Sequence, residues 1–337
     1  MDMEDKIMEH MLIDSFGRTI NNLRVSVTDQ CNFRCIYCMP EEGMVFQPKE
    51  EILTFEEITR VIRIVSTLGI SKIRLTGGEP TVRKDLPLLI SMISEIPGIK
   101  DMAMTTNGFF LKKMARDLRE AGLPRINVSL DTLDEEKFKQ MTRRDVLHKV
   151  IEGLEEAARY FQLPIKINVV AMKGYTEDDI LNFALLARTK PYQIRFIEFM
   201  PLDADRTWSR DQVLTGKEII DRIYSKWPLE AVTRPNQREP ADLFRFKDGP
   251  GEIGLIASVS EPFCGSCNRI RLTADGKLRT CLFSLNETDI KEPLRTGASD
   301  VDIADLFIEA VKNKEAGHHI NDPSFIQPER SMSAIGG

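Results

Sequence analysis

Six cysteines are the residues best suited to chemistry in this sequence, and they form two groups of three. The first group, Cys31, Cys35 and Cys38, lies in the stretch CNFRCIYC. The second group, Cys264, Cys267 and Cys281, lies in the stretch EPFCGSCNRIRLTADGKLRTCLFS. Thiolates at such short spacing are typical metal ligands. Each group provides three ligands, however, whereas a closed tetrahedral site requires four.

The missing fourth ligand separates the possible kinds of site. Zinc requires a fourth cysteine or a histidine, and none of His10, His148, His318 and His319 has ligand spacing to either group, although a remote histidine could still complete one. Three soft thiolates without a local fourth ligand suit an iron–sulfur cluster with one open iron. An open metal position is typical of a catalytic site, so the spacing favours catalysis over a structural role.

The composition is that of an ordinary globular protein of one large domain or two. The chain has 337 residues, 42% hydrophobic and 29% charged, and a net charge of −6. This charge provides no general attraction to nucleic acid or to an anionic membrane, so we expect neither as a partner. The opening MDMEDKIMEHMLIDSF does not have the pattern of a signal peptide, and no run approaches ~18 apolar residues. We expect a cytoplasmic protein, where thiols stay reduced and disulfides are disfavoured.

Residues 23–200 alternate between strand-like and helix-like segments. Apolar, β-rich runs lie at 23–28, 72–76, 101–106, 125–130, 165–170 and 193–199, and helical patterns lie between them at 54–69, 86–98, 111–122, 146–161 and 176–190. This alternation predicts a parallel sheet covered by helices. Six βα units are two short of a closed barrel, so we predict an α/β fold with a partial (βα)6 TIM-like barrel. A doubly wound sheet is the alternative, although no glycine-rich phosphate-binding fingerprint follows the first strand.

Polar residues follow every predicted strand. They are Cys31, the motif GGEP at 77–80, TTNG at 105–108, Ser129 with Asp131, MKG at 172–174, and Met200 with Pro201. Each loop taken alone is consistent with turn chemistry. In either α/β architecture, however, the carboxyl ends of the strands face one mouth and carry the active site. We therefore expect an active site there.

The chain changes character after residue 200. It has one helix within 206–227, a polar loop at 234–243, strand-like pieces, a hairpin at 261–284 that turns at Asp275-Gly276, and a helix at 301–316. The hairpin brings the second cysteine group together. We divide the chain into an N-terminal segment (1–22), the barrel (23–200) and a C-terminal α+β extension (201–337) that carries a second iron–sulfur cluster.

The C-x3-C-x2-C motif after the first strand, with Tyr37 before its last cysteine, resembles the radical S-adenosylmethionine (SAM) superfamily. In that superfamily the three cysteines hold a [4Fe-4S] cluster, and SAM chelates the fourth iron through its amino and carboxylate groups. The motif GGEP resembles the superfamily's strand-two motif, which contacts the methionine amino group. The resemblance implies that Tyr37, Gly78, Ser129 and Met200 line the SAM site.

The second cysteine group, the following Asn268-Arg269-Ile270-Arg271 and the terminal Gly336-Gly337 resemble a narrower family, the GTP cyclases of molybdenum cofactor biosynthesis. The resemblance runs from Leu23 to Gly337 and is weakest over 201–245. It implies a second [4Fe-4S] cluster, whose open iron faces the guanine of GTP. It places Gly336 and Gly337 in the active site as catalytic residues, and it assigns GTP contacts to Arg24, Arg74, Thr105, Lys166, Arg269, Ile270 and Arg271.

The same resemblance implies the reaction and the partners. A 5′-deoxyadenosyl radical from SAM takes the 3′-hydrogen of the GTP ribose, and C3′ then attacks C8 of the guanine. The product, 3′,8-cyclo-7,8-dihydroguanosine 5′-triphosphate, passes to a cyclic pyranopterin monophosphate synthase. An electron donor is required, and we expect a homodimer because family members are commonly dimers. Two alternatives stay open: another radical SAM enzyme with an auxiliary cluster, and a non-catalytic zinc or electron-transfer protein.

Overall fold

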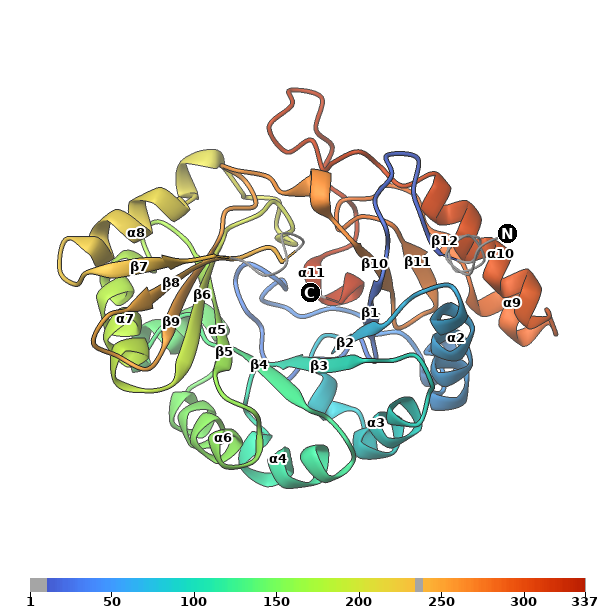
Figure 1. The fold of residues 1–337 in the computed structure, drawn as a ribbon, viewed down its shortest axis with the longest axis horizontal. Coiled ribbons are helices and arrows are strands. Elements are labelled where there is room, and N and C mark those ends of the chain that lie inside the picture. Colours follow the sequence, from blue (N-terminus) through green and yellow to red (C-terminus); the bar gives the residue numbers. More distant parts are fainter. Residues whose placement is uncertain (1–10, 234–238, 337) are drawn as a thin grey trace.

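The computed structural model describes residues 11–233 and 239–336, which fold around one curved sheet (Figure 1). Among these residues twelve strands join in the order β12-β11-β10-β1-β2-β3-β4-β5-β6-β9-β8-β7. Three parts of the predictions lie outside the described residues: residues 1–10 of the N-terminal segment, residues 234–238 of the polar loop, and Gly337.

The six predicted barrel strands are present, and their ends agree with the prediction to within two residues. They are β1 (Asn22–Ser26), β2 (Lys72–Thr76), β3 (Asp101–Thr106), β4 (Arg125–Ser129), β5 (Ile165–Ala171) and β6 (Tyr192–Glu198). Each strand from β1 to β5 pairs in parallel with the next strand in the sequence. A doubly wound sheet would reverse its strand order at a switch point. The partial barrel is therefore confirmed, and the doubly wound alternative is wrong.

The region after residue 200 extends both edges of this same sheet. At one edge, β9 (Glu252–Ile256) pairs in parallel with β6, and β8 (Asp242–Phe246) and β7 (Leu229–Val232) follow antiparallel. At the other edge, β10 (Arg269–Leu272) pairs in parallel with β1 and forms the predicted hairpin with β11 (Lys277–Arg279), to which β12 (Thr288–Asp289) adds. The boundary that we predict at residue 200 thus falls within a continuous sheet.

Helices cover the convex side of the sheet (Figure 1). They include α2 (Phe55–Thr67), α3 (Leu86–Ser94), α4 (Leu111–Glu120), α6 (Leu147–Tyr160) and α7 (Ile180–Thr189). The α2 helix begins at the expected capping box, in which Thr54 Oγ1 accepts from the Glu57 amide at 3.1 Å and the Glu57 carboxylate accepts from the Thr54 amide at 2.7 Å. The short α5 (Glu135–Thr142) was not predicted.

The remaining helices belong to the C-terminal region and to the loops. They are α8 (Gly216–Tyr224), α9 (Lys291–Arg295), α10 (Asp300–Lys312) and α11 (Met332–Ile335), together with the 3-10 turns η1 (Lys49–Glu51), η2 (Pro80–Val82), η3 (Glu177–Asp179), η4 (Arg210–Gln212) and η5 (Cys264–Ser266). None of the described helices has the length and apolar character needed to cross a membrane.

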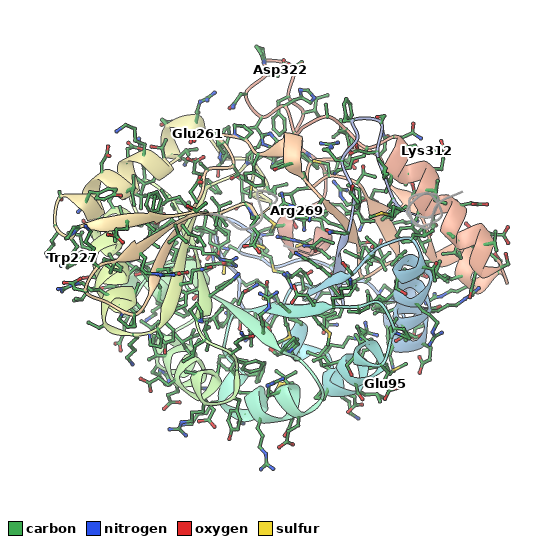
Figure 2. The ribbon with its side chains drawn as sticks, in the orientation of Figure 1. Glu95, Trp227, Glu261, Arg269, Lys312 and Asp322 are labelled. Carbon is green, nitrogen blue, oxygen red and sulfur yellow. The ribbon has the colours of Figure 1, made fainter. Side chains whose placement is uncertain are left out.

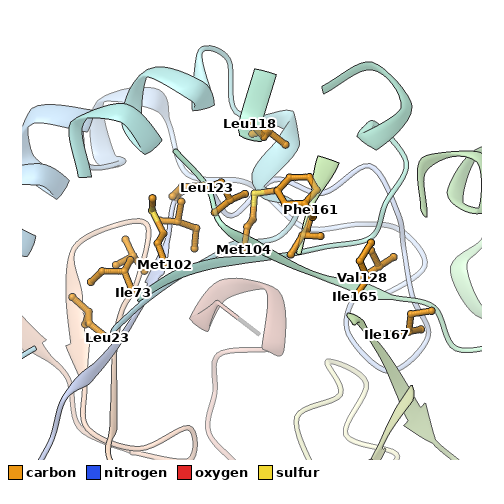
Figure 3. Packing of buried hydrophobic residues seen from close by; sticks show 14 of the residues in the cluster. Leu23, Ile73, Met102, Met104, Leu118, Leu123, Val128, Phe161, Ile165 and Ile167 are labelled. Carbon is orange, nitrogen blue, oxygen red and sulfur yellow. The ribbon is translucent and has the colours of Figure 1, made fainter. Parts of the chain in front are cut away.

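The two faces of the sheet differ in polarity because side chains alternate along each strand. Leu23, Ile73, Met104, Val128 and Ile167 point towards the helices and form the main core with side chains such as those of Leu118 and Phe161 (Figure 3). The alternate positions carry polar and charged side chains on the concave face. In Figure 1 this concave face surrounds α11.

Candidate active site

The GGEP loop after β2 packs against the loop that leads to Cys31. The Gly78 amide donates to the Thr28 carbonyl at 2.7 Å, and the Glu79 amide donates to the Gln30 carbonyl at 2.8 Å. A Cβ at Gly78 would lie 2.4 Å from the Gln30 carbonyl oxygen and 2.6 Å from that of Asp29. Only glycine permits this approach, so Gly78 brings the GGEP backbone against the cysteine loop.

Glu79 connects this loop to the TTNG loop after β3. Its buried carboxylate accepts from Thr81 Oγ1 at 2.5 Å, from Thr106 Oγ1 at 2.6 Å and from the Asn107 amide at 2.6 Å. The Asn107 side chain in turn donates to Asn32 Oδ1 at 2.9 Å. A buried carboxylate with several donors fixes the loops that hold them. The loops after three strands therefore form one rigid rim.

Arginine side chains hold the backbone around the first cysteine group. Arg34 Nη1 donates to the carbonyls of Cys31 (2.7 Å) and Phe33 (2.8 Å). Arg143 Nη1 donates to the Met39 carbonyl at 3.1 Å, and Arg144 Nε donates to the Asn32 carbonyl at 3.0 Å. All these arginines donate to backbone carbonyl oxygens, so none of these bonds occupies a cysteine thiol.

The thiols of the first group lie in surroundings that oppose their ionisation. Burial, reinforced by Glu79, raises the pKa of Cys31 to about 12, and burial raises that of Cys38 to about 11. The pKa of Cys35 is also raised, by burial and by Cys38 and Asp131. Cationic irons would favour the thiolate forms, because metal coordination deprotonates thiols.

The residues expected to line the SAM site follow or end neighbouring strands of the sheet. Tyr37 donates its hydroxyl to Asp131 Oδ2 at 2.6 Å, and Asp131 Oδ1 accepts from the Val170 amide at 2.8 Å. Ser129 ends β4, and Met200, which follows β6, packs on the small core formed around α11. All are at carboxyl ends of strands, as expected, which supports one site at this mouth.

The second cysteine group lies among cations at the opposite end of the barrel, beside the amino ends of the parallel strands β1 and β10. Cys264 is in η5, Cys267 follows it, and Cys281 follows β11. Although burial alone would raise the pKa of Cys267, Arg269 and Lys314 lower it to about 7, and Arg269 donates to its sulfur at 3.6 Å. Burial raises the pKa of Cys281. Arg269, which contacts Cys267, lies near the centre of the ring of strands (Figure 2).

The donor set of both groups fits a three-cysteine cluster. Each group offers three free thiols that are partly exposed. Among the described residues, no three His, Cys, Asp or Glu side chains approach closely enough to hold a single metal ion. His318 lines the same pocket as Cys264, and its ring nitrogens are both engaged: Nε2 contacts the Ser258 carbonyl (2.9 Å) and Nδ1 accepts from the Ile320 amide (3.2 Å). His318 therefore has no ring nitrogen free to act as a fourth ligand.

A row of basic residues crosses the concave face between the two groups. Strand register places Arg24 of β1 between Arg271 of β10 and Arg74 of β2. Arg269 lies two residues before Arg271, and Lys166 lies farther round on β5. The sequence predicted these five as substrate contacts, and the structure brings them onto one face.

Two further basic residues on this face were missed. Arg195 of β6 donates through Nε (3.0 Å) and Nη2 (2.7 Å) to Asn168 Oδ1, and Arg125 of β4 forms an ion pair with Asp101. Asp101 also binds Arg74 at 2.8 Å. Alternation along the predicted strands RINVSL and QIRFIEF could have identified both, because it places each arginine on the polar face.

The concentration of positive charge perturbs these groups. Burial and neighbouring Arg269 lower the pKa of Arg271 to about 9, and burial with neighbouring Arg195 lowers that of Lys166 to about 8. Burial also lowers the pKa of Arg195 to about 10, with Arg74 adding to the effect. Crowded, partly desolvated cations are unfavourable alone and are stabilised by an anion. The face is therefore suited to a polyanionic ligand.

The two remaining predicted substrate residues lie on opposite faces of the sheet, as strand alternation predicts for Ile270. Thr105 of β3 lies on the concave face, where its hydroxyl accepts from Asn127 at 3.3 Å. The Ile270 side chain is fully buried in the main core on the opposite face, paired in register with Leu23. A side-chain contact between Ile270 and a substrate is thus excluded by strand alternation, and only its backbone faces the site.

The C-terminal tail enters the barrel beside β1 and β2. Arg271 Nη1 donates to the Gly336 carbonyl at 2.7 Å. Gly336 has φ +72°, and a Cβ there would lie 2.7 Å from Thr76 Oγ1 and 2.9 Å from Ser26 Cβ. Ser333 contacts Met44 Sδ at 3.3 Å, and Arg330 binds both oxygens of Asp275 at 2.8 and 3.0 Å. The tail is therefore held at both ends, and Gly336 lies next to the basic row.

Comparison with known proteins agrees with this geometry. A model described as "Radical SAM superfamily" matches residues 25–187, and one described as "Molybdenum Cofactor Synthesis C" matches residues 192–320. Relatives named GTP 3′,8-cyclase from Streptomyces coelicolor and Syntrophomonas wolfei are 44% and 45% identical to the chain. The aligned part covers 97% of this chain in both cases, and 97% and 100% of the respective relatives.

Solved structures show the same fold at low sequence identity. Streptococcus suis SuiB bound to S-adenosylmethionine has a TM-score of 0.58 and 14% identity, covering 88% of this chain and 68% of SuiB. The complex of SuiB with the precursor peptide SuiA has a TM-score of 0.60 and 14% identity, covering 97% and 77%. Two cysteine groups on a partial barrel, together with relatives at 45% identity over nearly the whole length, show that this chain belongs to the GTP 3′,8-cyclase family of the radical SAM superfamily.

Proposed function

We propose that this chain is a radical SAM lyase that converts GTP to 3′,8-cyclo-7,8-dihydroguanosine 5′-triphosphate, the first step of molybdenum cofactor biosynthesis. One observation carries the proposal: a row of basic side chains spans the concave face between two groups of three cysteines. Arginine forks bind phosphate oxygens in pairs, so this row suits a triphosphate. The row would thus bind the triphosphate of GTP, the substrate in the name of the relatives.

The cysteines would hold two [4Fe-4S] clusters. Cys31, Cys35 and Cys38 would hold the cluster that binds SAM, with Tyr37, Gly78, Ser129 and Met200 around the cosubstrate. Cys264, Cys267 and Cys281 would hold the second cluster beside the guanine. When bound, the first cluster would supply the electron that cleaves SAM, and SAM would supply the radical that removes the ribose 3′-hydrogen. The protein's own part is to orient the reactants and to exclude water from the mouth.

The remaining residues would divide between the triphosphate and closure of the site. Arg24, Arg74, Lys166, Arg269 and Arg271 would bind GTP, with Thr105 and the Ile270 backbone nearby. We add Arg195, which Asn168 orients on the same face. Gly336 and Gly337 would close the mouth, with the Gly336 carbonyl orienting Arg271.

The partners follow from the reaction. An electron donor supplies the reducing equivalents, and the cyclised nucleotide passes to a cyclic pyranopterin monophosphate synthase. We also propose a cytoplasmic homodimer. These assignments rest on family membership.

The second candidate is a radical SAM enzyme with an auxiliary cluster that acts on a peptide. The fold is shared with SuiB, whose solved complex contains a precursor peptide. The concave face of this chain, however, carries basic side chains on β1, β2, β4, β5, β6 and β10, which suit a polyanion better than a peptide.

One experiment separates these functions. Anaerobically purified protein is incubated with SAM and dithionite, together with GTP or with a panel of peptides, and the products are identified by mass spectrometry. We expect 5′-deoxyadenosine together with a cyclised nucleotide from GTP alone, and about eight irons per chain. A modified peptide without nucleotide turnover would favour the second candidate. One or two equivalents of zinc in place of iron would contradict both functions.

A further inference from the structure

The segment Lys314–Gly317 contacts the neighbourhoods of all three cysteines in the second group. The buried Lys314 amino group donates to the Arg269 carbonyl at 3.3 Å and to the Thr280 carbonyl. Thr280 directly precedes Cys281, and Arg269 lies two residues after Cys267. One amino group thus joins the backbone near two ligands that are separated by 14 residues in the sequence.

The next residues of the segment reach the third ligand. The Glu315 carboxylate accepts from Thr280 Oγ1 at 2.7 Å and from Ser284 Oγ. Gly317 lies against Cys264, because a Cβ at Gly317 would be 3.3 Å from the Cys264 Cβ and 3.5 Å from its sulfur. The segment therefore passes over the Cys264 thiol while it binds the backbone near Cys281.

Arg18, from the N-terminal segment, joins the segment Lys314–Gly317 to the backbone of Cys264. Its Nη1 donates to the carbonyls of Cys264 (2.9 Å) and Ala316 (2.8 Å), and its Nη2 donates to the Glu315 carbonyl at 2.5 Å. Its Nε is paired with Asp14 at 2.6 Å, and the Asp14 side chain is fully buried. Because the Arg18–Asp14 pair is neutral overall, it orients the backbone around Cys264 without adding net charge. The planar guanidinium of arginine has enough donors in one plane to bind one carboxylate and three carbonyls together.

We infer that Arg18 and the segment Lys314–Gly317 form a bracket that sets the spacing of Cys264, Cys267 and Cys281. Arg18 is a positioning residue of the second cluster and has no part in holding the first. This inference rests on the proposed function in one respect, because it requires a second cluster at these three cysteines. It assigns a role to the N-terminal segment, for which sequence analysis found none.

The test compares Arg18→Lys with Arg60→Lys in the full-length protein. Arg60 provides a control for loss of the fork itself, because it also binds a carboxylate (Asp300, 2.8 Å) and a carbonyl (Ala298, 2.6 Å), in a more exposed pair on a helix that carries no cluster ligand. Lysine keeps the charge but loses the fork. We expect iron in the Arg18→Lys protein to fall from about eight to about four per chain. The remaining cluster should still change its electron paramagnetic resonance spectrum on addition of SAM, and Arg60→Lys should keep both clusters.

Each outcome bears on the inference. Eight irons in Arg18→Lys would overturn it. Four irons in the wild-type protein would instead refute the second cluster of the proposed function, and the inference with it. If Arg18→Lys does not fold, Lys314→Met removes the bonds to Arg269 and Thr280 and keeps a chain of similar length. Loss of both clusters in both variants would also overturn the inference, because the bracket would then support the whole fold.

Discussion

The two cysteine groups have the same three-thiol donor set but differ in the charges next to individual thiols. The first group has Glu79 and Asp131 nearby, and the pKa values of Cys31 and Cys38 are raised to about 12 and about 11, in both cases chiefly by burial. In the second group, Arg269 and Lys314 overcome the effect of burial and lower the pKa of Cys267 to about 7. In both groups an arginine donates to the carbonyl of the first cysteine: Arg34 to Cys31 and Arg18 to Cys264.

This difference indicates how one fold keeps two similar groups distinct. In the proposed function the first group receives SAM, which carries a sulfonium charge, and nearby carboxylates suit that cation. The second group adjoins the basic row, which suits a triphosphate. In the proposed function, the charges around each group would therefore suit different partners. Four predictions test this comparison.

Removing one thiol from each group should have the largest effect. We expect Cys35→Ser to abolish formation of 5′-deoxyadenosine and to leave only the second cluster. We expect Cys267→Ser to abolish cyclisation of GTP while SAM cleavage persists at a reduced level. Iron assays and chromatography of both products check this. If either variant loses both activities and both clusters, the two groups are not independent.

Alkylation of the metal-free protein should distinguish the two groups directly. At pH 7 the thiolate populations of Cys267 and Cys38 differ by about four powers of ten for pKa values of about 7 and about 11. The thiolate of the more acidic thiol is less nucleophilic, which reduces the rate difference by about two powers of ten. We therefore expect Cys267 to react about 100-fold faster than Cys38. Peptide mapping after timed iodoacetamide treatment measures the ratio. Equal rates would refute the difference in surroundings.

Gly336→Ala should slow turnover by about 10–100-fold, because a misplacement of about 1 Å near a reacting centre costs up to about 100-fold. The added Cβ would overlap Thr76 Oγ1 and displace the carbonyl that Arg271 binds. We expect the melting temperature to change little, since the tail adds few contacts to the main core. Gly297→Ala is the control, because its φ is also positive (+90°) but no atom lies within 4 Å of its Cβ position. Unchanged turnover in Gly336→Ala would contradict a role for the tail.

The smallest effect concerns the pH dependence of GTP binding. Burial and Arg195 lower the pKa of Lys166 to about 8, so its amine loses charge above that pH in the free protein. Binding a triphosphate favours the protonated amine, and each unit above pH 8 should raise the KM for GTP about tenfold. Lys166→Arg should reduce this slope between pH 8 and 9, because the pKa of arginine starts about two units above that of lysine. A flat wild-type profile would show that Lys166 does not meet the triphosphate.

The local structure was largely predictable, whereas the long-range pairing was not. The strand ends of β2 and β3 agree with the sequence pattern because apolar runs bounded by turns mark them. Periodicity contains no information on which distant strands pair, so the parallel addition of β9 and β10 at the two edges was missed.

The candidate site shows the same division. The cysteines and the residues that follow each strand could be identified because motif spacing and strand ends are local features. Arg195 and Arg125 were missed because no motif marks them, although alternation places them on the polar face. The bonds of Arg18 and Lys314 depend on tertiary contacts between distant segments, which no local pattern records.

The pairing of β1 with β10 has a consequence for synthesis of the chain. The two strands lie about 250 residues apart, so at 5–20 residues per second one edge of β1 lacks its partner for roughly 10–50 s after it emerges from the ribosome. Through that interval one edge of β1 exposes backbone groups that have no strand partner, which is a recognised route to aggregation. The chain should therefore depend on chaperones while it is being made, and should be recovered in better yield when translation is slow and cool.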